Sequence, residues 1–287
     1  MEQVVIPNPS HAGRPIQAGT APPPGVEFPA LGTTCHVLAL GRGASRLEWG
    51  RRWVVELGRR LTRFEPDSEL SQFNARAGAW TSVGGELEAL LREALRAYEL
   101  SGGLVHAGCL GAMLAIGYTR PMVEGLTEAR GPAPGPLPPL PDLLQVRRGR
   151  ARLAPGAGID LGGLAKGWMA DRLVERLGDN AVANLGGDLA ARGPGPAGEG
   201  WPVGVGAETV ALRDAGAATS GTSRRRWGTA HHLIDPRTGA PAVSDLSEVS
   251  VLASSATRAE VLAKTALLLG SERAPEFLAG RALGWAL

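Results

Sequence analysis

The chain has 287 residues, of which 44% are hydrophobic and 20% are charged, and it carries 30 basic against 28 acidic side chains. A chain of this composition is globular and long enough to bury a large core. Its net charge of +2 is small and its basic residues are spread along the sequence, so no dense basic patch indicates a nucleic acid as partner.

Signals for membranes and export are missing from the sequence. No apolar run reaches the roughly 18 residues that span a bilayer, and the first residues lack the charged start and apolar core of a signal peptide, as well as a lipobox. We therefore expect a cytoplasmic protein without a membrane segment. Cys35 and Cys109 are far apart and show no CxxC spacing, which argues against a disulfide framework and a zinc site.

The N-terminal part begins with residues 1–26, which are rich in proline, glycine and small polar residues. Such a segment buries too little surface to offset its ordering entropy, so we predict a flexible leader followed by one domain over 27–287. Alternating apolar residues predict a strand over 28–40, and apolar residues at helical spacing predict helices over 44–61 and 86–100.

Beyond a proline-rich connection over 131–144, a helix is predicted over 164–177. Short strands separated by glycine turns follow, and two helices split by Gly270 come last. These strands cover 181–185, 201–205, 231–234 and 247–254, and the helices cover 257–269 and 272–280. Strands that follow one another without regular intervening helices argue against a doubly wound parallel sheet. We predict an α+β fold of largely antiparallel sheets flanked by helices.

The segment IDLGGLAKGWMADRL at 159–173 holds one of only two lysines in a chain with 28 arginines. A strand-like start runs into Gly162-Gly163 and a helix, so amides at the helix start can face an anion. Lys166, in the first turn, can meet a phosphate as a compact point charge. Asp160 either accepts a hydrogen bond from a ligand or caps the helix. Alternatively, the glycine turn only packs and Lys166 is solvated.

Lys264 is the second lysine, and Glu260 lies four residues before it on the same face of a predicted helix. Such a pair is usually a surface stabiliser. Because this helix is mostly apolar, the alternative is a partly buried pair that needs a further partner or a ligand.

Two adjacent histidines, His231 and His232, follow a polar stretch near the end of the chain. Adjacent residues on a strand face opposite ways, so only one of the two can point into a given site. Histidine is suited to exchanging protons near neutral pH, although a structural histidine fits the same pattern.

Seven motifs follow one another from about Phe28 to the C-terminus. They are ALGTTC at 30–35, RFEPDSELSQFN at 63–74, IDLGGLAKGWMADRL at 159–173, NLGGDL at 184–189, ATSG at 218–221, HHLIDPRTGAP at 231–241 and AEVLAKTALLLG at 259–270. In this order they resemble the ApbE family, the FAD:protein FMN transferases. The resemblance implies an α+β fold around antiparallel sheets and binding of FAD, usually with magnesium. It also implies transfer of FMN to a threonine or serine hydroxyl of a target protein, with release of AMP.

The resemblance further implies which positions form the site. The residues against the flavin nucleotide would be Leu31, Phe64, Leu104, Val105 and His106, and Asp160 and Lys166 would also bind FAD. The carbonyl of Gly163 would help to hold the metal ion. His232 would lie beside the phosphates and take the proton from the attacking hydroxyl.

The implied metal site departs from the family pattern. The family normally has an aspartate and, four residues later, a threonine or serine, where this chain has Glu260 and Lys264. An ammonium only donates hydrogen bonds, so it cannot replace a hydroxyl ligand. Lys264 either lies where the metal would be or turns away, and Thr265 cannot substitute because it lies about 100° round the helix. In addition, His106 stands where the family commonly has an aspartate.

Three activities are compatible with these residues. The first is a flavin transferase, whose partners are FAD and an acceptor protein with a threonine or serine site. The second is an FAD pyrophosphatase, in which water replaces the acceptor hydroxyl and FMN and AMP are released. The third is a non-catalytic flavin-binding protein that lost metal-dependent turnover through Lys264.

Overall fold

The computed structural model describes residues 4–5, 24–121, 124, 131, 133–205, 208–222, 226–227 and 230–287. Within these residues the largest sheet has eight strands, and all of its neighbouring pairs are antiparallel except the outermost pair, β1 and β17. In spatial order the strands are β1 (Val4–Val5), β17 (Gly284–Ala286), β16 (Glu248–Ala253), β11 (Ala215–Gly221), β8 (Leu189–Arg192), β7 (Ala181–Leu185), β3 (Thr33–Ala39) and β2 (Gly25–Ala30).

Both faces of this sheet are buried, as the alternation along β7 illustrates. Ala181, Ala183 and Leu185 pack into the core beneath the helices, whereas Val182 joins a separate cluster on the opposite face. That opposite cluster includes the apolar side chains of a hairpin made by β9 (Trp201–Val205) and β10 (Glu208–Leu212). Because side chains alternate along a strand, central strands such as β7 and β8 contribute to two cores.

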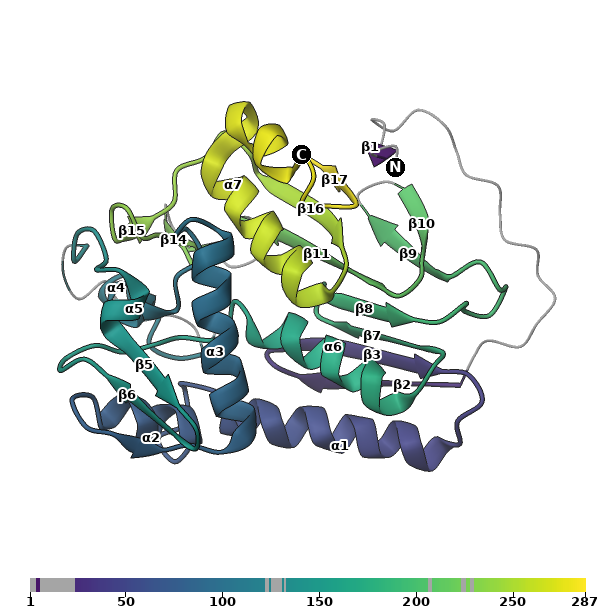
Figure 1. Ribbon diagram of the computed structural model, residues 1–287, viewed down its shortest axis with the longest axis horizontal. Helices are drawn as coiled ribbons and strands as arrows, with labels where there is room; N and C mark the ends of the chain where they lie inside the picture. Colours follow the sequence, from purple (N-terminus) through teal and green to yellow (C-terminus); the bar gives the residue numbers. More distant parts are fainter. Residues whose placement is uncertain are drawn as a thin grey trace.

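Three helices lie side by side over one face of the sheet (Figure 1): α1 (Ala44–Arg60), α6 (Ala165–Leu177) and α7 (Ala256–Leu278). Their buried apolar residues form the main core with the strands below. At Gly270 the backbone of α7 leaves helical geometry, with φ of 78° and ψ of 172°. The predicted division of the last helical region at Gly270 is therefore confirmed.

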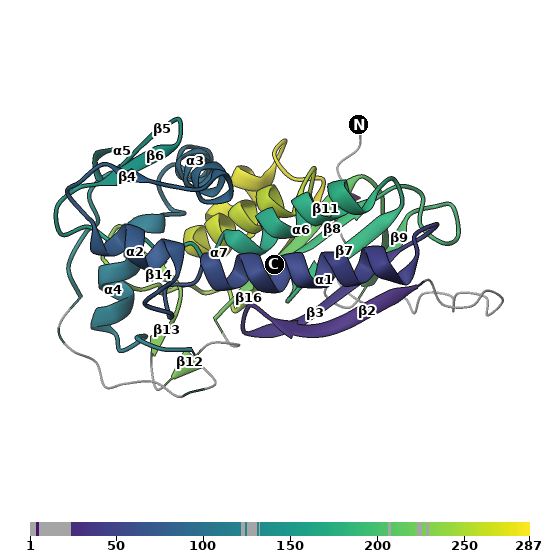
Figure 2. The same cartoon turned by 90° about the horizontal axis from the view of Figure 1, so that it is seen from below.

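A second group of elements lies beside the sheet, at one end of α1 (Figure 2). Its helices are α2 (Glu69–Ala75), α3 (Gly85–Leu100), η1 (Ala107–Cys109), α4 (Leu110–Ala115) and α5 (Leu140–Leu143), and its antiparallel sheet is formed by β4 (Thr81–Ser82), β6 (Arg150–Leu153) and β5 (Leu144–Arg147). Two small hairpins pair β12 (Arg226–Trp227) with β13 (Ala230–His231) and β14 (Ile234–Asp235) with β15 (Ala240–Pro241).

The predicted α+β class is confirmed, but two predicted strands are wrong. Residues 28–40 divide into β2 and β3 because Leu31 and Gly32 adopt positive φ values of 57° and 69°, which reverses the chain. The apolar alternation continues on both sides of this turn, so it does not mark the break. Residues 231–234 also divide, because His231 pairs with Arg226 in one hairpin and Ile234 pairs with Pro241 in the next.

The predicted leader over 1–26 lies mostly outside the described residues. The structure describes Val4–Val5, which pair with Gly284 and Trp285, and residues 24–26, of which the last two begin β2. In the described part of the chain, no helix combines the length and apolarity needed to cross a bilayer.

Candidate active site

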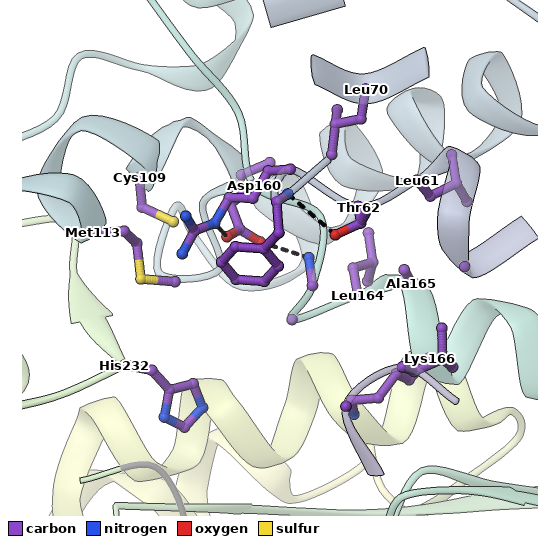
Figure 3. A pocket seen from close by; sticks show the side chains of 18 of the residues that line it. Leu61, Thr62, Leu70, Cys109, Met113, Asp160, Leu164, Ala165, Lys166 and His232 are labelled. Atoms are coloured by element: carbon purple, nitrogen blue, oxygen red, sulfur yellow. Dashed lines mark hydrogen bonds and ion pairs between the residues drawn. The ribbon is translucent and has the colours of Figure 1, made fainter. Parts of the chain in front are cut away.

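A cavity of about 500 Å³ opens between the large sheet with its helices and the second group of elements. Its walls come from the β2–β3 turn, the end of α1 and the segment that follows it, the segment after α3, the loop before α6, and α7. In Figure 3, Cys109 and Met113 lie on one side, Leu61 and Leu164 on the other, and His232 and Lys166 at the lower edge. The cavity is therefore apolar over much of its wall and charged at one end.

The structure brings the predicted site residues together in this cavity. Its lining includes Leu31, Phe64, Leu104, Val105, His106, Asp160, Gly163, Lys166, His232 and Lys264. A smaller cavity of about 90 Å³ adjoins it and is lined by Glu260, Asp188 and the Thr219–Gly221 segment, and the two share Lys166, His232 and Lys264. Residues that are up to about 230 positions apart in the sequence thus converge on one place.

Lys166 is held at the charged end by a buried carboxylate. Its ammonium donates to Oδ2 of Asp188, and the side chains are only 13% and 4% exposed. Asp188 follows the glycine pair of the β7–β8 hairpin, where Gly186 and Gly187 have φ values of 75° and 101°. The predicted alternative of a solvated Lys166 is wrong, because the hairpin carries Asp188 to the first turn of α6.

Lys264 is turned toward the cavity rather than away from it. Its Nζ donates to the carbonyl oxygen of Gly163 at 2.6 Å and lies 3.6 Å from Oε1 of Glu260. Gly163 leaves room for this contact, because a Cβ at that position would lie 2.4 Å from the lysine nitrogen. Thr265 is fully buried and its hydroxyl donates to the carbonyl of Val261, as expected for a residue on a different side of the helix.

Glu260 is a buried carboxyl in this charged end, 5% exposed. Burial raises its pKa to about 7; the nearby charge of Asp188 adds to this rise, whereas Lys264 and Lys166 oppose it. Within the described residues its Oε2 has no hydrogen-bond partner. The predicted surface pair is wrong, since the apolar surroundings of α7 enclose both side chains.

The relative position of the two lysines is fixed by a link between their helices. Asp171 of α6 accepts hydrogen bonds from the amides of Ala256 and Thr257 at 2.8 and 2.9 Å and from the Thr257 hydroxyl at 2.6 Å. These amides belong to the first turn of α7, where intrahelical acceptors are lacking. Gly167 allows close approach, because a Cβ there would lie 3.0 Å from the Ala256 carbonyl oxygen.

Asp160 does not cap α6, contrary to one of the two predicted roles. Its carboxylate accepts from Nε of Arg63 and, at 2.6 Å, from the amide of Gly162. The α6 helix instead begins after Leu164 without a side-chain cap. Arg63 and Asp160 are nearly buried, and the guanidinium lies 4.2 Å from the ring centroid of Phe64 and 4.6 Å from that of Tyr118.

The amides at the start of α6 are largely occupied within the chain. The amide of Gly162 donates to Asp160, and those of Leu164 and Ala165 donate to the carbonyl of Leu161 at 2.9 and 2.8 Å. The prediction that these amides face an anion is therefore wrong for the three residues. These three amides close the turn before α6, whereas the side chains of Lys166 and Lys264 line the cavity.

His106 lines the cavity, but both of its ring nitrogens are engaged. Nδ1 accepts from the amide of Gly108 at 3.0 Å, so Nε2 carries the proton and donates to the carbonyl of Pro138 at 2.9 Å. Burial lowers the pKa of this imidazole, and its hydrogen bond to the Pro138 carbonyl opposes the shift. Any contact of His106 with a ligand would come from its ring carbons or its backbone.

The two adjacent histidines face different surroundings. His231 is buried, with Nε2 2.9 Å from the carbonyl oxygen of Ala242, and its Nδ1 accepts from the amide of Leu233. His232 lines both cavities and lies at the lower edge of the larger one (Figure 3). The prediction that only one of the pair faces the site is confirmed.

Sequence reasoning did not single out several residues of this site. Arg63 stands in the quoted motif RFEPDSELSQFN, yet a buried arginine is visible only once Asp160 is placed beside it. Met113, Tyr118 and Cys109 come from a segment without periodic signal. Burial raises the pKa of the Cys109 thiol to about 12, with a further rise from the Asp160 charge that Lys264 and Arg63 oppose.

The shape and chemistry of the cavity suit an elongated ligand with an aromatic part and an anionic part. Apolar walls and the Phe64 and Tyr118 rings can enclose a flat ring system, and the two lysines can meet phosphate oxygens. A dinucleotide such as FAD combines these features. The residues present therefore fit the flavin nucleotide.

A magnesium ion fits the same residues poorly. Magnesium takes oxygen ligands at about 2.0–2.1 Å, but here the Gly163 carbonyl accepts from Lys264 and Glu260 lies beside the same ammonium. A divalent ion about 4 Å from an ammonium would be repelled by about 8 kcal/mol at an effective dielectric constant of about 20. Elsewhere in the described residues, no group of three or more His, Cys, Asp or Glu side chains is placed to hold a metal.

The fold and cavity together define a protein that binds an elongated nucleotide at the junction of an antiparallel sheet and a smaller lobe. The sequence model of the ApbE family matches residues 31–285, and the chain belongs to this family.

Named relatives agree with this assignment. The chain is 35% identical over 290 residues to the FAD:protein FMN transferase of Treponema pallidum, covering 85% of this chain and 78% of that protein. It is 25% identical over 281 residues to the FAD:protein FMN transferase of Haemophilus influenzae, covering 86% and 80%. The crystal structure of the ApbE protein of Thermotoga maritima, 23% identical, covers 89% of each chain with a TM-score of 0.75 and shows the same fold.

Proposed function

We propose that this protein transfers the FMN half of FAD to a threonine or serine hydroxyl of a target protein, with release of AMP. The observation that carries the proposal is the convergence of both lysines and His232 at one end of an otherwise apolar cavity. Membership in a family whose relatives are named FAD:protein FMN transferases supports the same reaction.

In this proposal the apolar end of the cavity binds and orients the flavin. Phe64, Leu104 and Val105 pack against the ring system, and Leu31 closes the rim. The Arg63 guanidinium stacks on Phe64 and holds Asp160. Fixing the flavin nucleotide in this way places its phosphorus for attack, which is where most of the acceleration in phosphoryl transfer originates.

The charged end neutralises the diphosphate and handles the proton. The acceptor oxygen forms a bond to the FMN phosphorus, the bond from that phosphorus to the bridging oxygen breaks, and AMP leaves with the bridging oxygen. Lys166 and Lys264 stabilise the negative charge on the phosphate oxygens. His232 takes the proton from the attacking hydroxyl. No magnesium ion takes part in this proposed step, because the Lys264 ammonium lies at the Gly163 carbonyl and Glu260 carboxylate that would hold it.

Incubation of the purified protein with FAD and a panel of candidate acceptor proteins tests this proposal. We expect a covalent flavin adduct, seen by in-gel fluorescence and by a mass increase equal to FMN minus water, together with one AMP per adduct. FMN and AMP without adduct would establish the pyrophosphatase activity instead. If FAD binds but reacts neither with any acceptor nor with water, both the FMN transferase and the FAD pyrophosphatase activity are overturned.

A further inference from the structure

We propose that the ammonium group of Lys264 takes the place of a divalent cation, so that this chain neutralises its diphosphate substrate without a bound metal ion. The identity of the diphosphate rests on the proposed function. The position of the ammonium does not, since it follows from contacts within the chain.

The first argument is the set of oxygen atoms around the nitrogen. Nζ of Lys264 donates to the Gly163 carbonyl at 2.6 Å and lies 3.6 Å from the Glu260 carboxylate. Backbone carbonyl and carboxylate oxygens are the ligands that hard divalent cations prefer. An ammonium bound to these oxygens occupies the place that such an ion would need.

The second argument is that the ammonium is held in place. The Lys264 side chain is 15% exposed, and its nitrogen lies in the space that a side chain at Gly163 would fill. The helix that carries it is fixed to α6 through Asp171. A cation that is positioned before the substrate arrives needs no reorganisation during the reaction, which is the property that makes it effective.

The third argument is the choice of side chain. All but two of the 30 Lys and Arg residues in the chain are arginines, and both lysines line this end of the cavity. A guanidinium is a broad planar fork, whereas an ammonium is a compact charge with three donors. Gly163 takes one donor and Glu260 is near a second, so a third is left for a ligand oxygen.

Binding of Mn²⁺ to the flavin-free protein, followed by electron paramagnetic resonance, tests the inference directly. We expect the wild type and Lys264→Met to leave the spectrum of free Mn²⁺ unchanged. We expect Lys264→Thr, or Lys264→Thr combined with Glu260→Asp, to bind one Mn²⁺ per chain. Stoichiometric Mn²⁺ binding by the wild type would overturn the inference, and so would the failure of both threonine variants to bind it while remaining folded by circular dichroism.

A second measurement compares FMN transfer in a chelator with transfer in excess Mg²⁺. The wild type should be equally active in both, Lys264→Met should lose about 10²-fold in rate in both, and the threonine variants should become dependent on Mg²⁺. Wild-type activity that a chelator abolishes would contradict the inference. If no FMN transfer is detected at all, the proposed function fails, whereas the Mn²⁺ titration still decides the role of Lys264.

Discussion

The two ends of the cavity are built in different ways. At the apolar end, side chains from several helices and loops surround one buried ion pair, Arg63 with Asp160. At the charged end, each lysine is held by an acceptor on a neighbouring element, Asp188 for Lys166 and Gly163 for Lys264. On the proposed function, we expect the apolar end to set the affinity for FAD and the charged end to set the rate of FMN transfer.

The largest effect is expected from replacing His232, which tests whether the charged end sets the rate of FMN transfer. We expect His232→Asn to reduce the rate of FMN transfer by about 10²–10⁴-fold, because the attacking hydroxyl loses its base. The dissociation constant of FAD, measured by flavin fluorescence, should change little. His231→Asn is the matched control, and it should act through stability instead, since that ring is buried. Equal effects of the two variants on rate would contradict the assignment.

Lys166→Met should affect both the rate and the fold. It leaves the buried Asp188 without its ion partner, and breaking such a pair costs about 3–5 kcal/mol of unfolding free energy. Combining Lys166→Met with Asp188→Asn should recover much of that stability, as measured by urea denaturation. Activity should stay low in both variants. Recovery of activity along with stability would show that Lys166 is only structural.

At the apolar end, Arg63→Met should raise the dissociation constant of FAD by about tenfold, through loss of the stacked cation and release of Asp160. The turnover rate at saturating FAD should fall much less. Arg63→Lys keeps the charge and is the control, with an intermediate affinity. A variant that lowers turnover without changing affinity would reverse the roles given to the two ends.

The link between the helices predicts a smaller effect. Asp171→Ala removes a capping acceptor from the first turn of α7 and should cost about 1–2 kcal/mol, measured as a lowered urea midpoint. Ser255→Ala, which removes the other cap of the same helix, is the comparison. Only Asp171→Ala should also lower the rate of FMN transfer, because Asp171, unlike Ser255, joins α7 to the helix of Lys166.

The smallest effect on stability is expected from the buried thiol of Cys35. Burial raises the pKa of Cys35 from 9.0 to about 11, so at pH 8 its thiolate, and its rate with a disulfide reagent, should be about 100-fold below those of an unfolded thiol. The corresponding stability is complete below pH 9.0 and is lost as the pH rises through about 11. The rate at which a disulfide reagent modifies Cys35, measured at several pH values, checks this. Rapid modification at pH 8 would contradict the burial of this thiol.

The charged end could be predicted from the sequence and the apolar end only in part. The two rare lysines and the paired glycines lie in short local segments, so they indicated Lys166 and Lys264 directly, whereas His232 was singled out from His231 only by the family resemblance. Arg63 and Asp171 owe their importance to partners about 97 and 85 positions away, and local patterns carry no such information. The same limit explains the β2–β3 turn, since alternation shows which residues are buried but not where the chain reverses.

The wall of the cavity includes a residue with a strained backbone conformation, Leu31. Leu31 has a φ of 57°, a conformation that costs a side chain with a Cβ about 1–2 kcal/mol. Its side chain rests against Gly58 of α1, where a Cβ would come within 2.6 Å of it. A glycine inside a helix ordinarily lowers helix stability, but Gly58 makes room for the Leu31 side chain. A larger side chain at position 58 would displace Leu31 and change the shape of this wall of the cavity.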